Sequence, residues 1–258
     1  MACFRASIRS QVMEMDTLVN VVVPYDQYDP NGEPRKIDKL LYLLHGLKQN
    51  ADSWQRFSSA ERYAGYYGYA VIMPEVQRSF YTDMVFGPQY FTYLTEELPQ
   101  VMHRMFRLPD DPQKTFVGGL SMGGYGALKC ALNYPDRYAG AICLSSGFDL
   151  LTDPERLVNI YRNREELQGL TGLDLRAKPE DDLYAIADAW PRDKSKPRLY
   201  IAVGTEDYLH GKNQEMCKRL VKDGFTPCYE EWPGIHDWRF WDVGLERGLR
   251  YMAGLPTT

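Results

Sequence analysis

Residues 116–126 read FVGGLSMGGYG, and the rest of the chain is interpreted outward from this stretch. Within it, residues 119–123 (GLSMG) match the G-x-S-x-G pattern of a nucleophile elbow, a sharp turn between a strand and a helix. Glycines flank the serine because side chains there would clash where the strand and helix cross. A β-prone run at 114–117 precedes the pattern, and a helical run at 125–133 follows it. We therefore interpret Ser121 as a nucleophile raised above a sheet, the alternative being a glycine-rich turn with an ordinary N-cap serine.

Short apolar runs alternate with helical stretches along the chain. Runs typical of strands buried on both faces lie at 39–44, 69–73, 138–144 and 198–203. The last strand is predicted at 227–232, and the last helix at 238–252. This alternation predicts an α/β protein with a mostly parallel central sheet and helices on both faces.

Three further segments refine this architecture. Residues 2–12 and 17–23 alternate or are β-branched, and they predict an antiparallel hairpin at one edge of the sheet. A helix is expected from an N-cap at Ser53 to about residue 67, and another over 90–106 that Pro99 kinks or restarts.

A charged stretch at 148–190 interrupts the alternation. It is too short for a core of its own, so we interpret it as a small cap-like insertion over the carboxyl edge of the sheet. The chain is otherwise predicted to form one domain over residues 1–258.

Composition excludes several function classes. The net charge is −5, from 30 basic and 35 acidic residues, and no basic cluster is dense enough to predict a nucleic-acid partner. No run of 18 apolar residues occurs, so no membrane span is expected. The first residues alternate and lack the apolar core of a signal peptide, which together with five scattered cysteines predicts a cytoplasmic protein. The spacing offers no metal motif, and we expect no metal or organic cofactor; whether the chain forms a homo-oligomer is left open.

A serine hydroxyl needs a base within hydrogen-bond reach, and histidine is the usual one. The histidines of the chain are His45, His103, His210 and His236. In an α/β-hydrolase the order is serine, acid, histidine, with the histidine after the last strand, and only His236 fits both conditions. The acid should follow the preceding strand, where Asp207 is our choice and Glu206 the second. Asp237 is disfavoured because adjacent side chains in an extended loop point apart.

Attack on a carbonyl creates an oxyanion, which needs hydrogen-bond donors placed in advance. One predicted donor is the backbone N–H of Met122, directly after the serine. The other is the N–H of Leu47, in the loop that follows the strand at 39–44. In this scheme His45 shapes the loop and is not a base.

Several segments together resemble one known family, the esterase D-type α/β-hydrolases, and most of all its tributyrin esterase and feruloyl esterase group. The segments that carry the resemblance are Leu43–Leu47 with Asp52–Trp54, Ser79–Asp83, Tyr90–Tyr93 with Glu96–Pro99, the Gly118–Gly124 elbow, and His236–Trp238 with Phe240-Trp241. The resemblance covers nearly the whole chain and implies the α/β-hydrolase fold, Ser121, Asp207 and His236 as the triad, and a cap near the acyl pocket. The same motifs serve acetyl-xylan esterases, S-formylglutathione hydrolases and mycolyltransferases.

The sequence therefore predicts a serine carboxylesterase that hydrolyses short-chain acyl or feruloyl-type esters through an acyl-enzyme. Its expected partner is a small-molecule or carbohydrate-linked ester. Pocket residues are predicted to be Gln49, Trp54, Phe80, Tyr81 and Trp238, although each is also a residue type that commonly packs. The alternatives are a carbohydrate acetyl esterase or S-formylglutathione hydrolase, an acyltransferase, and a non-catalytic binding protein of hydrolase fold.

Overall fold

The computed structural model describes residues 1–258 except 29–30, 34–36, 109, 150, 162 and 192. The strands are β1 Ala2–Ser10, β2 Met15–Val23, β3 Lys39–Leu44, β4 Tyr69–Pro74, β5 Thr115–Leu120, β6 Gly140–Leu144, β7 Arg198–Gly204 and β8 Cys228–Trp232. The α-helices are α1 Ser53–Phe57, α2 Ala60–Tyr67, α3 Tyr90–Thr92, α4 Leu98–Phe106, α5 Met122–Asn133, α6 Pro154–Tyr161, α7 Arg164–Thr171, α8 Leu183–Asp188, α9 His210–Lys222 and α10 Trp238–Met252. A π-helical turn η1 covers Tyr93–Glu97, and 3-10 turns η2 and η3 cover Pro112–Lys114 and Pro179–Asp181.

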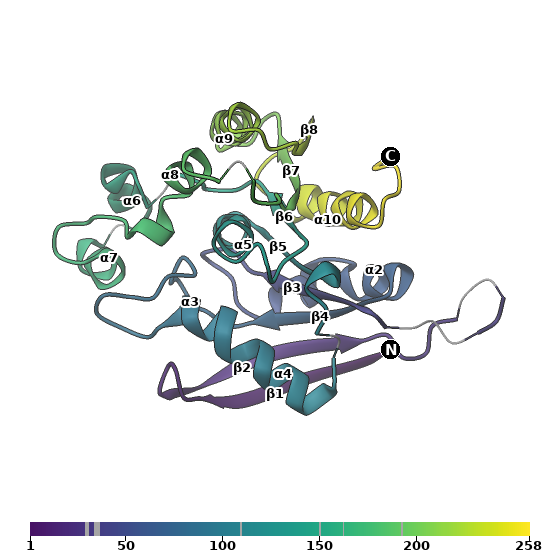
Figure 1. Cartoon of the computed structure of the whole chain (residues 1–258). Helices are drawn as coiled ribbons and strands as arrows, with labels where there is room; N and C mark the ends of the chain where they lie inside the picture. The colour runs from purple at the N-terminus through teal and green to yellow at the C-terminus, as the bar shows by residue number, and fades with distance from the viewer. Residues whose placement is uncertain (29–30, 34–36, 109, 150, 162, 192) are drawn as a thin grey trace.

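The strands of the described residues form one sheet in the order β1-β2-β4-β3-β5-β6-β7-β8 (Figure 1). β1 pairs with β2, and β2 with β4, in antiparallel fashion, whereas every pair from β4 to β8 is parallel. This confirms the mostly parallel sheet and the N-terminal edge hairpin. The carboxyl ends of β3 to β8 therefore meet at one edge, where an α/β sheet places its site.

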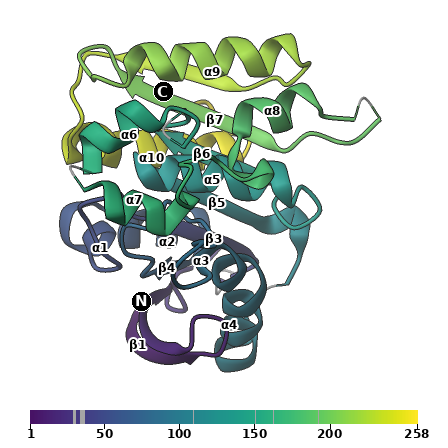
Figure 2. The same cartoon turned by 90° about the vertical axis from the view of Figure 1, so that its left-hand side faces the viewer.

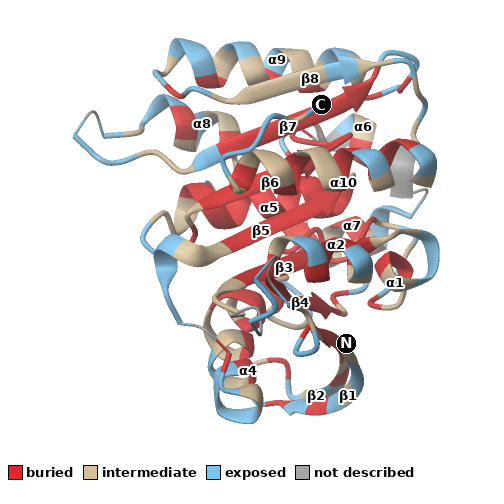
Figure 3. Cartoon of the chain, turned by 90° about the vertical axis from the view of Figure 1, so that its right-hand side faces the viewer, coloured by how far each residue is buried: buried red, intermediate tan, exposed pale blue. Residues whose placement is uncertain are grey.

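Helices cover both faces of the sheet, and each face has its own apolar core. Alternate residues of β3 divide between the two cores, with Tyr42 and Leu44 in one and Leu41 and Leu43 in the other. The first core includes residues of α4, α5 and α9, and the second includes residues of α1, α2 and α10. Figure 3 shows the central strands buried between these layers. A strand buried on both faces is uniformly apolar, as the sequence pattern predicted.

The helix predicted from Ser53 to about residue 67 is wrong in its continuity, because it is two helices. Ser58 adopts an extended conformation after α1, and its hydroxyl donates to the carbonyl of Trp54 at 2.5 Å. Such local side-chain bonds compete with the helical backbone. The N–H of Ser59 bonds the Asp242 carboxylate at 2.7 Å, so α10 fixes the break. The expected cap is also wrong: Asp52 holds the N-cap position, and Ser53 is the first helical residue.

The stretch over 90–106 restarts near Pro99, as predicted. The π-helical turn η1 joins α3 to α4, and Pro99 lies within the first two residues of α4. A proline cannot donate to the carbonyl one turn back, and the Thr95 carbonyl accepts from Arg137 Nη1 at 2.5 Å instead.

The 148–190 segment holds α6, α7, η3 and α8, with residues 150 and 162 outside the described part. α6 packs on α7, while α8 contacts both α5 and α9. In Figure 2, α6 and α7 lie on the side of the molecule that faces the viewer, as does α5. That this segment caps the site, and that 1–258 is one domain, stay predictions. No helix of the described residues is long and apolar enough to cross a membrane.

Candidate active site

Ser121 occupies a strained turn between β5 and α5. Its φ of 53° and ψ of −116° lie in a region that residues with a side chain rarely adopt. A Cβ on Gly123 would lie 2.2 Å from the Leu44 carbonyl oxygen, and one on Gly119 would lie 2.8 Å from the same atom. Both positions therefore exclude a side chain, because β3 passes directly beside the turn. The local geometry is that of the predicted elbow.

The loops after β7 and β8 bring Asp207 and His236 into direct contact. His236 Nδ1 lies 2.8 Å from Asp207 Oδ2, and the Leu209 N–H donates to Asp207 Oδ1 at 2.8 Å. The Asp207 side chain is fully buried. Burial alone would raise the pKa of Asp207, but the hydrogen bond and charge of His236, with the Leu209 N–H, hold it below its usual value. Asp207 is thus suited to stay ionised and to hold the Nδ1–H tautomer of His236.

The two other acids considered from the sequence have different partners. The Glu206 carboxylate accepts the N–H of Gly234, which joins the loops after β7 and β8. Asp237 accepts the N–H groups of Arg239 and Phe240 and so caps α10. Neither carboxylate contacts the His236 ring in the described hydrogen bonds, which favours Asp207 as its partner.

The other histidines are engaged elsewhere. His45 is buried, with Nδ1 2.9 Å from the Gly46 carbonyl and Nε2 accepting the Val76 N–H at 3.3 Å. His103 bonds a backbone carbonyl at the end of α4, and His210 contacts the Glu231 carboxylate at 3.0 Å. His45 therefore fixes the loop after β3, in line with the shaping role expected for it.

Two aromatic rings enclose His236, and the sequence reasoning missed their role. Tyr208 packs on the imidazole with ring centroids 4.6 Å apart, and Trp241 meets it edge-on at 4.9 Å. Tyr208 is 69% exposed, so its ring forms part of the surface beside the histidine. The only sequence signal is that Tyr208 directly follows Asp207. These rings restrict the orientations that the imidazole can adopt.

Ser121 lies at the same edge of the sheet as this pair. Only β6 separates β5 from β7 in the sheet, so their carboxyl ends are about 10 Å apart at the usual strand spacing. Loops with long side chains span that gap. Among the described hydrogen bonds, none joins the Ser121 hydroxyl to His236. A catalytic contact between serine and base is often long in the absence of substrate.

The predicted oxyanion donors, Leu47 and Met122, lie in the loop after β3 and at the first residue of α5. In the part of the chain that the structure describes, neither N–H donates a hydrogen bond to another protein atom. The Gln49 side chain folds back to accept the Gly46 N–H at 2.9 Å. Gln49 thus braces the loop that carries Leu47, and the N–H groups of Leu47 and Met122 have no acceptor among the described protein atoms.

Three of the five predicted pocket residues are core residues. Trp54, Phe80 and Tyr81 are at most 1% exposed. The Trp54 indole N–H donates to the Leu44 carbonyl at 3.0 Å, and its ring meets Trp238 edge-on. These three side chains therefore pack in the core and do not form an open wall of the site. Trp238 is partly exposed, as is Gln49.

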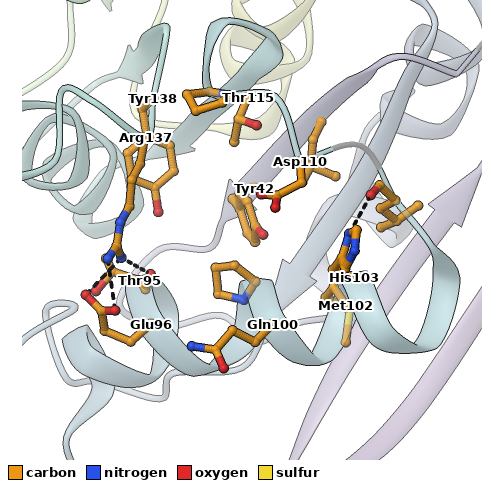
Figure 4. Close-up of a pocket in the computed structure, with 14 residues that line it drawn as sticks. Tyr42, Thr95, Glu96, Gln100, Met102, His103, Asp110, Thr115, Arg137 and Tyr138 are labelled. Atoms are coloured by element: carbon orange, nitrogen blue, oxygen red, sulfur yellow. Dashed lines mark hydrogen bonds and ion pairs between the residues drawn. The ribbon is translucent and has the colours of Figure 1, made fainter.

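A cavity of about 220 Å³ lies at the opposite end of the sheet (Figure 4). Leu40 and Thr115, near the starts of β3 and β5, line it together with Tyr42, Arg137 and residues of α4. β5 is six residues long, so its start and Ser121 are separated by roughly 20 Å. This cavity is therefore not part of the site around Ser121.

Comparisons with known proteins place this geometry in a family. Residues 10–252 match the family described as "Putative esterase". An acetyl esterase from Caldicellulosiruptor saccharolyticus is 30% identical, over 98% of each chain. The structure resembles a fluorophosphonate-binding serine hydrolase of Staphylococcus aureus (TM-score 0.87) and an S-formylglutathione hydrolase of the same organism (TM-score 0.84). Each is 32% identical to this chain over 98% of both chains.

Proposed function

The chain belongs to this esterase family, and we propose that it is a serine carboxylesterase in which Ser121, Asp207 and His236 act as the catalytic triad. The observation that carries the proposal is the combination of the strained Ser121 elbow with a buried Asp207 bonded to His236 Nδ1 at the same sheet edge. The relatives support ester hydrolysis in general, and the assignment of residues rests on the geometry.

In the proposed reaction His236 Nε2 accepts the proton of Ser121 as the hydroxyl oxygen attacks the ester carbonyl. The carbonyl oxygen becomes an oxyanion, which the N–H groups of Leu47 and Met122 stabilise. Collapse breaks the ester C–O bond, and His236 returns the proton to the departing alcohol. Water then attacks the acyl-enzyme, His236 taking its proton and passing it to Ser121 as the acid is released. Asp207 holds the imidazole and stabilises its charged form throughout.

We propose short acyl groups, of the acetyl to butyryl size, as the acyl half of the substrate. Trp54, Phe80 and Tyr81 were predicted as pocket residues, and all three are buried in the core. The acetyl esterase relative, which aligns over 98% of this chain, supports the same size class.

The test is a hydrolysis panel with p-nitrophenyl acetate, butyrate and octanoate, methyl ferulate and an acetylated sugar. We expect kcat/KM to be highest for the acetyl or butyryl ester and Ser121→Ala to lower it by at least about 10³-fold. Methyl ferulate turned over as well as the acetyl ester would refute the acyl size. Unchanged turnover by Ser121→Ala would refute the nucleophile. An added alcohol that captures most of the acyl group would instead identify an acyltransferase.

The second candidate is S-formylglutathione hydrolysis, favoured by the full-length structural likeness to a protein of that activity at 32% identity. Formyl is smaller than acetyl and fits the same acyl argument. The two candidates differ in the leaving group, which is a thiol in this case. A kcat/KM for S-formylglutathione at least a hundredfold above that for p-nitrophenyl acetate would support it, and a lower value would exclude it.

A further inference from the structure

A lysine is buried in the helix that follows Ser121. α5 reads MGGYGALKCALN, and Lys129 is its one charged residue, with a side chain that is 0% exposed. Removing an ammonium group from water costs several kcal/mol unless partners compensate it. The position of these partners therefore indicates what the charge holds in place.

The Lys129 ammonium is fully engaged. It lies 2.5 Å from Asp181 Oδ1, donates to the Tyr81 carbonyl at 2.9 Å, and lies 3.9 Å from the centre of the Phe91 ring. Asp181 belongs to η3 in the 148–190 segment and is itself 2% exposed. The Thr82 hydroxyl donates to the same Asp181 oxygen at 3.0 Å. One buried ion pair thus joins α5, the 148–190 segment and the loop at 79–83.

The loop at 79–83, whose Tyr81 carbonyl accepts from Lys129, has a strained backbone. Phe80 and Tyr81 have φ values of 52° and 53°, although neither is glycine. Bulky residues adopt this conformation only where the surroundings enforce it. The Lys129 ammonium holds the Tyr81 carbonyl, and the Ser79 hydroxyl accepts the Tyr81 N–H at 3.1 Å. Both backbone groups of Tyr81 are therefore fixed, and with them the direction of its side chain.

That side chain reaches the loop at 45–47 after β3, which carries the predicted donor Leu47 and is called the oxyanion loop below. The Tyr81 hydroxyl donates to the His45 carbonyl at 2.8 Å, one residue before Gly46. Its ring packs against α5, since a Cβ on Gly126 would lie 2.5 Å from one of its atoms. Burial raises the pKa of Tyr81 well above its usual value, so the hydroxyl stays a donor. The bond fixes the peptide that leads into Leu47, whose N–H is the proposed oxyanion donor.

We propose that Tyr81 is a positioning residue for the oxyanion loop and that the buried Lys129–Asp181 pair holds it in place. The 148–190 segment is then coupled to the oxyanion hole through Asp181. This proposal rests on the proposed function of Ser121. A purely structural role for the pair predicts no particular effect on the transition state. Nor does stability alone require the pair, since buried ion pairs can often be replaced by apolar residues without loss of stability.

The first test is Tyr81→Phe, which removes the hydroxyl and keeps the ring against α5. We expect kcat for p-nitrophenyl acetate to fall about tenfold, the order of one lost hydrogen bond, with KM changed less than about twofold. A trifluoromethyl ketone, whose serine adduct places an oxyanion in the hole, should bind about tenfold more weakly. A kcat within twofold of the unmodified protein, or a loss confined to KM, would overturn the proposal.

The second test removes the ion pair without leaving a buried charge. The double variant Lys129→Met with Asp181→Asn retains an oxygen for the Thr82 hydroxyl and should lose kcat and inhibitor affinity in parallel, by about tenfold or more. The matched control is Asp188→Asn, which breaks an ion pair between α8 and Arg219 of α9. That contact also ties the 148–190 segment to the body of the protein but does not reach the loop at 79–83. Equal losses in the control would refute a specific coupling.

A readout independent of turnover separates this proposal from the proposed function. Backbone hydrogen exchange over residues 43–50 should be at least about fivefold faster in Tyr81→Phe than in the unmodified protein, and unchanged in Asp188→Asn. Faster exchange in an inactive protein would support the positioning contact while refuting the esterase. Unchanged exchange in an active esterase would refute the contact and leave the triad standing.

Discussion

Replacing Asp207 by Asn tests the proposed triad through the tautomer of His236. In the structure Oδ1 accepts the Leu209 N–H and Oδ2 faces His236 Nδ1, both at 2.8 Å. An asparagine must keep its oxygen toward Leu209, which puts its NH₂ group against Nδ1. The imidazole then has to accept at Nδ1 and carry its proton on Nε2. In that form it cannot take the proton of Ser121.

The expected loss in kcat is the sum of two energetic costs. Turning the amide leaves the buried Leu209 N–H unsatisfied, at about 1–3 kcal/mol, and loss of the carboxylate removes about 1.5–3 kcal/mol of charge-assisted bonding to the imidazolium. The total of about 2.5–6 kcal/mol corresponds to roughly 10²- to 10⁴-fold in kcat at 1.36 kcal/mol per factor of ten. KM should change little, because the ground-state ester does not touch the aspartate.

The assay is steady-state hydrolysis of p-nitrophenyl acetate at constant pH, with folding checked by circular dichroism. Glu206→Gln is the matched control, since its carboxylate is the neighbouring acid but accepts the N–H of Gly234 and not a ring N–H of His236 in the described contacts. We expect it to retain kcat within about threefold. A kcat for Asp207→Asn within tenfold of the unmodified protein would refute Asp207 as the acid. A larger loss in Glu206→Gln than in Asp207→Asn would assign that role to Glu206.

Three further predictions concern the neighbourhood of the elbow. Gly123→Ala places a Cβ 2.2 Å from the Leu44 oxygen, so it should lower stability by about 1–3 kcal/mol and kcat/KM by about 100-fold. The control is Gly211→Ala in α9, where no atom lies within 4 Å of the added Cβ; it should leave the kinetics unchanged and the melting temperature equal or slightly raised, and equal losses in both variants would contradict the clash. Tyr208→Ala should lower kcat/KM about three- to tenfold by freeing the histidine ring, with a melting temperature within about 2 °C, and an unchanged rate would show that the ring contact does not matter. The pKa of Asp207 is lower in the folded protein than its usual value, so the ionised carboxylate stabilises the fold above about pH 4, and this stabilisation is lost as the pH falls below that. The melting temperature of the unmodified protein should therefore fall more steeply between about pH 4 and 2.5 than that of Asp207→Asn. Parallel curves for the two proteins would be the contrary result.

The sequence predicted those parts of the molecule that depend on local chemistry and chain order. The apolar strands, the edge hairpin and the elbow each leave a pattern within a few residues, and the order serine, acid, histidine then selected Asp207 and His236. The break in the helix after Ser53 left no such pattern, because Asp242, 183 residues away from Ser59, helps to fix it. A helical period reports which residues share a face but not what a distant segment does to the backbone.

Side-chain direction was the other limit. Trp54, Phe80 and Tyr81 were predicted as pocket residues, but their rings are buried in the core. The left-handed backbone at Phe80 and Tyr81 decides this, and neither residue type announces it. The contact between Lys129 and Asp181 joins residues that are 52 positions apart, and no pattern in the sequence indicates it. It is evident only in the folded structure.

Backbone strain identifies the same region as the motif does, by an independent route. Among the described residues, eight that are not glycine have positive φ, and five of them follow strands at the carboxyl edge: Gln77, Phe80, Tyr81, Ser121 and Ser145. Strain of this kind costs roughly 1–3 kcal/mol per residue and persists only where the surroundings enforce it. The enforcing contacts here include a buried ion pair, which is itself costly. Two unfavourable features maintained side by side are hard to explain by stability alone. The cost is understandable if the edge must hold Ser121 and the backbone donors near it in one fixed geometry.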